Sequence, residues 1–167
     1  MTNQQSQAII KSELARLTSE FFRAVSFEVG ETPPYEIIHA LFIDSGLIIK
    51  NSGAAPEIST VQQFIEPRQA MVRTGELTRF REVELSEATD IFGNVAHRFS
   101  AYAKSGTMKG APFEARGMIS TQFIRTGGGW AVSSLKRNTR FNELRMKAGE
   151  SWPGSARTPP AGYASCA

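Results

Sequence analysis

The first part of the chain has the apolar spacing of an amphipathic helix. From about residue 4 to residue 28, apolar side chains recur every three or four positions. The stripe consists of Ile10, Leu14, Leu17, Phe21 and Val25. Charged residues lie off the stripe, and Gly30 stands where the helix is expected to end. The pattern predicts one long helix with a single buried face.

A short second helix is predicted next, because prolines suit the first turn of a helix. It begins near Pro33-Pro34, and its apolar residues are Tyr35, Ile38, Leu41 and Phe42. A turn at residues 44–46 and a short strand at 47–49 follow. A third helical region then runs from a capping box at Ser59 to Gln62 as far as Arg73.

From Leu77 onward the hydrophobic period changes from 3.6 to 2, which is typical of strands. Strands are predicted at residues 77–85, 94–104, 113–125 and 130–137, with a hairpin turn at 127–129. Helices followed by an antiparallel meander predict an α+β fold with about three N-terminal helices on one face of the sheet.

The alternation also predicts which side chains face the helices. On strand 94–104 we assign this inner face to His97, Phe99, Ala101 and Ala103, and the outer face to Arg98, Ser100, Tyr102 and Lys104. On strand 113–125 the inner face is assigned to Ala115, Gly117, Ile119, Thr121 and Phe123. The helix-facing side is thus predicted to be mainly apolar.

Length and composition exclude several classes of protein. The chain has 167 residues, which is the size of one domain, and its net charge of +3 is too weak to indicate nucleic-acid binding. One cysteine and two histidines argue against a disulfide framework and a metal site. No apolar run is long enough for a membrane span, and the N-terminus does not have the pattern of a signal peptide, so we expect a cytoplasmic protein. We expect a domain over residues 1–138 and a Pro/Gly-containing extension over 139–167.

Several short runs resemble the nuclear-transport-factor-2-like superfamily, in its SnoaL-like branch of small bacterial proteins. The runs are Phe80-x-Glu82-x-Glu84, the segment from Phe92 to Tyr102, Arg116-Gly117, Ser120-x-Gln122-Phe123 and Gly129-Trp130-x-Val132. The resemblance implies a cone of helices against a strongly curved, mainly antiparallel sheet that encloses a pocket. One departure is the basic run from Lys136 to Arg140, where the branch commonly has a Trp followed by acidic residues.

The resemblance also implies where catalytic groups would stand. Ketosteroid isomerases, which share the fold, use an Asp base and an oxyanion hole made by a Tyr and a protonated Asp. The matching positions here are Lys50-Asn51, Phe21-Phe22 and Thr121. None of these residues supplies the required acid or base, so that chemistry is not expected.

Two polar groups on the strands have structural interpretations. Glu82, Glu84 and Arg116 are predicted to form a salt-bridge network across strands, with acid–base chemistry as the alternative. A second set is interpreted as an outer sheet face that meets another subunit, with a polar ligand site as the alternative; it comprises Ser100, Tyr102, Ser120 and Gln122.

We expect a pocket that binds a small apolar metabolite, without a cofactor. His97 is the candidate polar or catalytic residue, since a neutral imidazole can pin a carbonyl or hydroxyl group. The predicted ligand-binding residues are His97, Asn51, Thr121, Phe22, Phe42, Phe99 and Phe123, and the apolar lining also includes Phe21, Ile119 and Leu135. One alternative is an enzyme of the cyclase, dehydratase or isomerase type that uses His97.

A second alternative is a structural or accessory homodimer. A sheet face carrying tyrosine, methionine and polar side chains is costly to leave exposed, so we expect a homodimer through the outer sheet face. The predicted contacts include Arg98, Tyr102, Met118 and Gln122.

Overall fold

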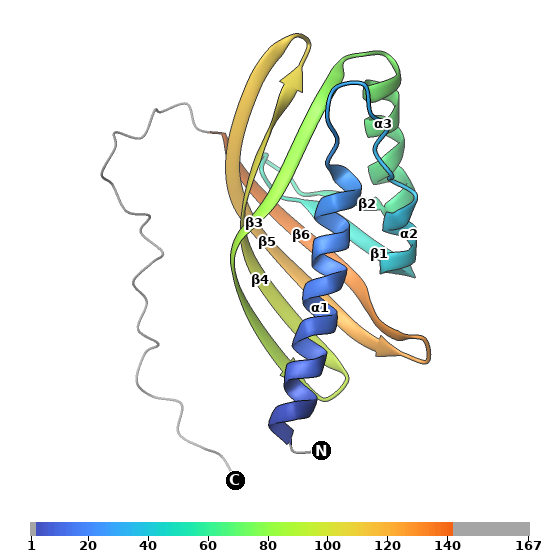
Figure 1. Cartoon of the computed structure of the whole chain (residues 1–167), viewed down its shortest axis with the longest axis vertical. Helices are drawn as coiled ribbons and strands as arrows, with labels where there is room; N and C mark the ends of the chain where they lie inside the picture. Colours follow the sequence, from blue (N-terminus) through green and yellow to red (C-terminus); the bar gives the residue numbers. More distant parts are fainter. Residues whose placement is uncertain (1–2, 142–167) are drawn as a thin grey trace, which may run out of the picture.

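The computed structural model describes residues 3–141, in which helices pack on one face of a curved sheet (Figure 1). The helices are α1 (Asn3–Val25), α2 (Ile37–Leu41) and α3 (Val61–Arg73). The strands are β1 (Phe42–Lys50), β2 (Glu57–Thr60), β3 (Leu77–Phe92), β4 (Val95–Met108), β5 (Ala111–Thr126) and β6 (Gly129–Phe141). The predicted α+β class is confirmed.

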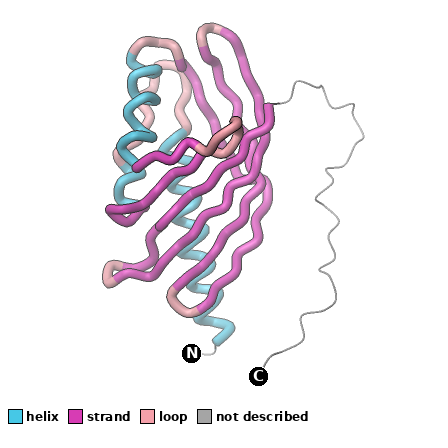
Figure 2. The backbone as a smooth tube through the Cα atoms, turned by 180° about the vertical axis from the view of Figure 1, so that it is seen from behind, coloured by secondary structure: helices cyan, strands magenta, loops and turns pink. Residues whose placement is uncertain are grey.

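The six strands form one mixed sheet in the order β2-β1-β6-β5-β4-β3. Every neighbouring pair is antiparallel except β1 and β6, which are parallel. Figure 2, seen from behind, shows the strands in front of the helices, so one face of the sheet is free of helices. The prediction of a mainly antiparallel sheet with helices on one face is therefore confirmed.

Some helix and strand ends differ from the predicted ones, because they depend on contacts that the hydrophobic periodicity does not reveal. Helix α1 ends at Val25 rather than near residue 28, because Phe27 pairs with Phe80 in an isolated bridge. The capping box belongs to Thr60 and Gln63, not to Ser59 and Gln62. Strand β2 was not predicted, and the predicted turn at 44–46 lies inside β1, where the register against β6 shifts.

Most of the apolar residues predicted to line a pocket instead fill the core between helices and sheet. Phe22, Phe42 and Phe123 are buried in one hydrophobic cluster, together with Phe21, Ile119 and Leu135. The Phe21 ring lies 6.1 Å from that of Phe22 and 6.4 Å from that of Phe42, centroid to centroid. These rings fill the space against one another, as expected of a close-packed interior.

The assignment of faces on β4 was wrong. Arg98 is 5% exposed and Tyr102 is fully buried, whereas Phe99 is 45% exposed. The strand register agrees, because Arg98 stands opposite the buried Thr121 while His97 stands opposite Gln122. His97 and Phe99 therefore lie on the outer face.

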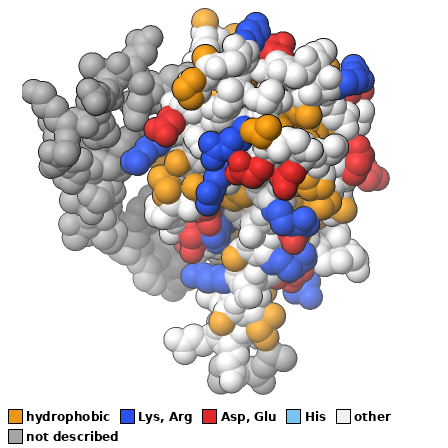
Figure 3. All heavy atoms as spheres, turned by 45° about the horizontal axis from the view of Figure 1, so that its top comes forward, with side chains coloured by type: hydrophobic (Ala, Val, Ile, Leu, Met, Phe, Trp, Pro, Cys, Tyr) orange, Lys and Arg blue, Asp and Glu red, His pale blue; other side chains and the backbone are white. Residues whose placement is uncertain are grey.

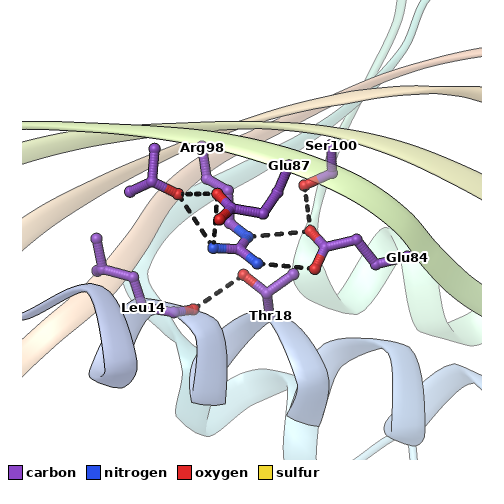
Figure 4. A network of polar contacts seen from close by, with 7 residues as sticks. Leu14, Thr18, Glu84, Glu87, Arg98 and Ser100 are labelled. Atoms are coloured by element: carbon purple, nitrogen blue, oxygen red, sulfur yellow. Dashed lines mark hydrogen bonds and ion pairs between the residues drawn. The ribbon is translucent and has the colours of Figure 1, made fainter. Parts of the chain in front are cut away.

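A polar network explains why charged groups face inward on β4 (Figure 4). The guanidinium of Arg98 donates to both carboxylate oxygens of Glu84, at 3.0 and 2.7 Å. Ser100 also donates to Glu84 at 2.6 Å, and Glu87 lies 3.1 Å from Arg98. A buried charge is tolerated when it is paired and hydrogen-bonded in this way.

The predicted network of Glu82, Glu84 and Arg116 is wrong in its partners. Glu84 pairs with Arg98 and Glu82 with Arg137. Arg116 is exposed and stands opposite Ala103 on the outer face. The two glutamates belong to separate ion pairs inside the cone.

The last strand continues to Phe141, three residues past the predicted domain boundary at 138. The remainder of the predicted extension, residues 142–167, lies outside the described residues. Within residues 3–141, the structure contains no helix with the length and apolar character of a membrane span.

Candidate functional site

A cavity of about 500 Å³ lies between the helices and the part of the sheet next to the β4–β5 turn, and we call it the cone cavity. Its apolar wall includes Val25, Phe64, Met71, Leu77, Phe80 and Phe113. Its charged and hydroxyl-bearing residues include Tyr35, Lys50, Glu57, Arg68, Glu82, Lys104, Lys109, Arg137 and Thr139. Figure 3 shows hydrophobic, basic and acidic side chains mixed on this end of the molecule.

A buried ion pair crosses the interior of the cone. Arg137 on β6 donates to a carboxylate oxygen of Glu82 on β3. These strands are separated in the sheet by β4 and β5, so the two side chains meet across its concave face. Burial opposes the charge of Arg137, but Glu82 and Tyr102 outweigh it and raise the pKa of this guanidinium.

The same carboxylate has one atom that the fold does not satisfy. Glu82 is 2% exposed, and its second oxygen, Oε2, is buried without a hydrogen-bond partner. Glu82 also lines the cone cavity. A buried acceptor without a donor is costly, so this atom is a candidate contact for a bound molecule.

Tyr102 shapes the wall beside this ion pair. Its ring lies over Gly117 on β5, where an added Cβ would come within 2.8 Å of the ring. The tyrosine hydroxyl thereby reaches Thr139 on β6 and forms a hydrogen bond with its hydroxyl group. The guanidinium carbon of Arg137 lies 5.2 Å from the centre of the ring, which is within cation–π range.

Arg68 brings a second guanidinium to the cavity from helix α3. Its guanidinium carbon lies 3.5 Å from the centre of the Phe64 ring, and Nη1 donates to the Phe64 carbonyl at 2.7 Å. Burial and the nearby Arg137 lower the pKa of Arg68 to about 10. Burial also raises the pKa of Tyr35, although Arg68 opposes that shift.

Lys104 supplies the third interior cation. It is the direct cross-strand neighbour of Glu82, and its side chain lines the cavity. Burial and the charge of Arg137 lower the pKa of its amine to about 8, although Glu82 acts in the opposite direction. Neighbouring like charges and burial both disfavour the ammonium form.

Positive charge exceeds negative charge in the wall. Among the described residues the cavity is lined by five basic side chains and two acidic ones. One of the acids, Glu82, forms an ion pair with Arg137. The carboxylate of the other, Glu57, accepts a hydrogen bond from the Lys50 ammonium at 2.9 Å. Arg68, Lys104 and Arg137 line the same partly apolar cavity, and this excess of positive charge favours an anion there.

The predicted site residues do not meet in this cavity. Thr121 is buried on the inner face opposite Arg98, and Asn51 is exposed, its carbonyl accepting from Asn138 at 2.8 Å. His97 lies on the outer face and forms a 3.0 Å hydrogen bond with Ser120. Phe99, also on the outer face, has its ring centre 6.1 Å from that of His97.

Four polar residues, Ser100, Tyr102, Ser120 and Gln122, were predicted to share the outer face of the sheet, and this prediction is wrong for two of them. Ser100 and Tyr102 are buried on the inner face, whereas Ser120 stands opposite Phe99 and Gln122 opposite His97 on the outer face.

Arg68, Lys104 and Arg137 were missed as site residues. The register of β4 against β5 pairs Arg98 with the inward Thr121, and this turns every even-numbered residue of 98–104 inward, Lys104 included. Hydrophobicity alone does not show this register. Across residues 3–141, no group of three or more His, Cys, Asp and Glu side chains is arranged to hold a metal ion.

Solved structures share this fold. A nuclear-transport-factor-2-like superfamily protein from Salmonella enterica is 12% identical, with a TM-score of 0.66 over 87% of this chain and 99% of that chain. The hexachlorocyclohexane dehydrochlorinase LinA-type3 from Novosphingobium barchaimii is 12% identical, with a TM-score of 0.67 over 95% of this chain and 100% of that chain. A protein from Kribbella flavida is 14% identical, with a TM-score of 0.68 over 81% of this chain and 93% of that chain.

No protein-family model matches the sequence, and no curated protein does. At the identities above, the likeness is one of fold. The chain has the nuclear-transport-factor-2-like fold, which occurs in ligand-binding proteins and in enzymes such as the dehydrochlorinase. The fold expected from the resemblance is therefore confirmed.

Proposed function

We propose that the chain binds a small amphipathic acid in the cone cavity. The acidic group would lie at Arg68 and Lys104, with Arg137 behind them, and the apolar body would pack against the wall formed by Phe64, Phe80 and Phe113. The observation that carries the proposal is the excess of positive charge in a cavity with apolar walls. Ligand sites commonly combine an apolar wall with a few fixed polar groups.

Two of the cations, Arg68 and Lys104, support this proposal because burial and a neighbouring cation disfavour their charged forms. Arg137 is a cause of the lowered pKa of both Arg68 and Lys104, so the cations destabilise one another. A bound carboxylate would offset that repulsion and accept charge-assisted hydrogen bonds. The proposal keeps the predicted small apolar molecule and adds an acidic group to it.

The enzyme alternative that uses His97 is not retained, because the imidazole lies on the outer face of the sheet and outside the cone cavity. The activity named for the Novosphingobium protein is not transferred to this chain, because the two share the fold alone.

Matched pairs of ligands test the proposal. We would measure binding of cinnamate, 2-naphthoate and decanoate by isothermal titration calorimetry at pH 7, each against its primary amide. At least one acid is expected to bind ten-fold or more tightly than its amide. Equal binding of acids and amides, or binding of none, would contradict the proposal.

Variants locate the site. Arg68→Met keeps most of the aliphatic length but removes the guanidinium, so it should weaken acid binding about ten-fold, or about 1.4 kcal/mol, and leave amide binding unchanged. Arg81→Met is the matched control, since Arg81 is exposed and adjacent in sequence to the inward Glu82. If both variants weaken binding equally, the acid binds elsewhere.

A further inference from the structure

We propose that Lys104 forms a reversible imine with the carbonyl group of an acid bound in the cone cavity. The inference rests on the proposed function and deepens it: the ligand class becomes an aldehyde or ketone that also carries an acidic group. Its basis is the position of the lysine amine among cations, beside a buried carboxylate and an apolar wall.

The first observation is the place of the amine. Lys104 extends from β4 into the cavity, whose wall includes Phe80 and Phe113, and the centres of these rings are 6.2 Å apart. Gly106, two residues further along β4, allows the Phe113 ring to approach the strand, since a Cβ there would lie 2.8 Å from the ring. Imine formation releases water, and an apolar surrounding favours that loss.

The second observation is the charge around the amine. The charged groups that face the cavity are Lys50 from β1, Glu57 from β2, Arg68 from α3, Glu82 from β3, Lys109 after β4 and Arg137 from β6. Cations among these groups and burial bring the pKa of Lys104 to about 8. At pH 7 such an amine is uncharged in roughly one molecule in ten, against fewer than about one in a thousand for an ordinary lysine.

The third observation is a carboxylate that lines the same cavity as the lysine. Glu82 is the cross-strand partner of Lys104, and its Oε2 is buried without a hydrogen-bond partner. Lysines that act as nucleophiles are commonly desolvated or placed next to other cations, and a base in the same site can accept their proton.

The reaction balances without an oxidant or reductant. The Nζ lone pair forms a bond to the carbonyl carbon, and the C=O π pair moves to the oxygen. One Nζ proton moves to that oxygen, for which the Glu82 carboxylate would be the carrier, and the product is a carbinolamine. The C–O bond then breaks as the nitrogen lone pair forms C=N, and the second Nζ proton leaves with the oxygen as water.

The test uses 4-formylcinnamate, which adds an aldehyde to the cinnamate used above. The full chain is treated with this probe and sodium cyanoborohydride at pH 7, and the modified lysines are located by peptide mass spectrometry. Lys104 is expected to be labelled at least ten-fold faster than the exposed Lys136. Labelling of Lys104 should reach half its maximum rate near pH 8, where its amine loses its proton.

Two substitutions control for folding and charge. Lys104→Arg keeps the positive charge but cannot form an imine, so it should bind cinnamate and lose the fast labelling. Lys136→Met should leave the fast labelling unchanged. Labelling of Lys104 no faster than that of Lys136, or fast labelling that persists in Lys104→Arg, would overturn the inference.

The outcomes separate the two proposals. If cinnamate binds with the expected acid preference but Lys104 is not labelled preferentially, the imine is wrong and the binding site stands. If Lys104 is labelled rapidly but acids bind no better than amides, the imine stands and the acid preference is wrong. If neither result is obtained, both proposals fail.

Discussion

At the scale of single residues, Lys104 shows how a group proposed to bind a ligand reduces the stability of the fold. Its pKa of about 8 means that the folded state disfavours the ammonium form. An unfolded chain would hold the same lysine at its ordinary value of about 10.5. Binding sites often keep such unfavourable groups because a ligand compensates for them.

Replacing this lysine is therefore expected to stabilise the protein. Lys104→Met should raise the free energy of unfolding at pH 7 by about 1–2 kcal/mol, a figure reduced for partial solvent access. Below about pH 8 the amine is charged in both states and the penalty is complete. As pH rises from about 8 to about 10.5, the folded state loses the Lys104 proton before the unfolded state does. The difference in unfolding free energy between Lys104→Met and the wild type should therefore shrink.

Urea unfolding of Lys104→Met and of the exposed control Lys136→Met, at pH 7 and pH 9.5, measures this effect. If the unfolding free energy of the control rises as much as that of Lys104→Met, the cause is the loss of one positive charge from the protein and not the removal of a buried amine.

Gly117 is the second residue considered at this scale, because it lies under the Tyr102 ring beside the buried ion pair. An added Cβ would lie 2.1 Å from the Asn138 carbonyl oxygen and 2.8 Å from the Tyr102 ring. Because the nearest atom is backbone, β6 would have to shift. Gly117→Ala is expected to reduce the free energy of unfolding by about 1–3 kcal/mol and to disturb the hydrogen bond between Tyr102 and Thr139.

Thermal and urea unfolding check this expectation, with Gly128→Ala as the control. Gly128 lies in the exposed hairpin turn, where the nearest atom to an added Cβ is Thr126 Oγ1 at 3.8 Å. Equal effects of the two substitutions would contradict the account of Gly117.

At the scale of elements, the helices and long strands could be predicted because their periods are clear. The face of β4 could not be assigned from hydrophobicity, because its inward side chains include Arg98, Ser100 and Lys104. A polar inward face that is paired internally has the same sequence pattern as a face in water. Part of the candidate site was missed for this reason, because Lys104 was assigned to the outer face and His97 to the inner face.

The start of α3 offers a test at this scale. The Thr60 side chain accepts from the Gln63 amide at 3.2 Å, and the Gln63 side chain accepts from the Thr60 amide at 3.0 Å. Thr60→Ala removes one half of this box and should cost about 1 kcal/mol of unfolding free energy. Ser59→Ala, one residue earlier, should cost less, and the comparison by urea unfolding distinguishes the observed cap from the predicted one.

At the scale of the whole molecule, the cavity charges set a pH dependence for ligand binding. A bound anion favours the charged form of Lys104, whose pKa is about 8 in the free protein. Acid binding should therefore be tightest below about pH 8 and weaken as the lysine loses its proton. Calorimetry with cinnamate is expected to show several-fold weaker binding at pH 9 than at pH 7, and Lys104→Met should abolish this pH dependence.

The assembly prediction also belongs to this scale. Of the four predicted contacts, Arg98 and Tyr102 are buried inside the cone, while Met118 and Gln122 stand opposite outer-face residues of β4. Phe99 is 45% exposed on the same face. We still predict a homodimer through this face: light scattering should give twice the mass of the chain at micromolar concentration, and Phe99→Asp should give the monomer. A monomeric wild-type protein would contradict the prediction.

The parallel pairing of β1 with β6 determines the order in which a growing chain can fold. During synthesis β1 leaves the ribosome long before β6, from which it is separated by β2, α3 and the strands β3 to β5. The meander from β3 to β6 can assemble from neighbouring hairpins, whereas β1 has only β2 beside it until β6 arrives. In the nascent chain, one edge of β1 therefore stays unpaired until β6 is made, and an unpaired strand edge can pair with another chain.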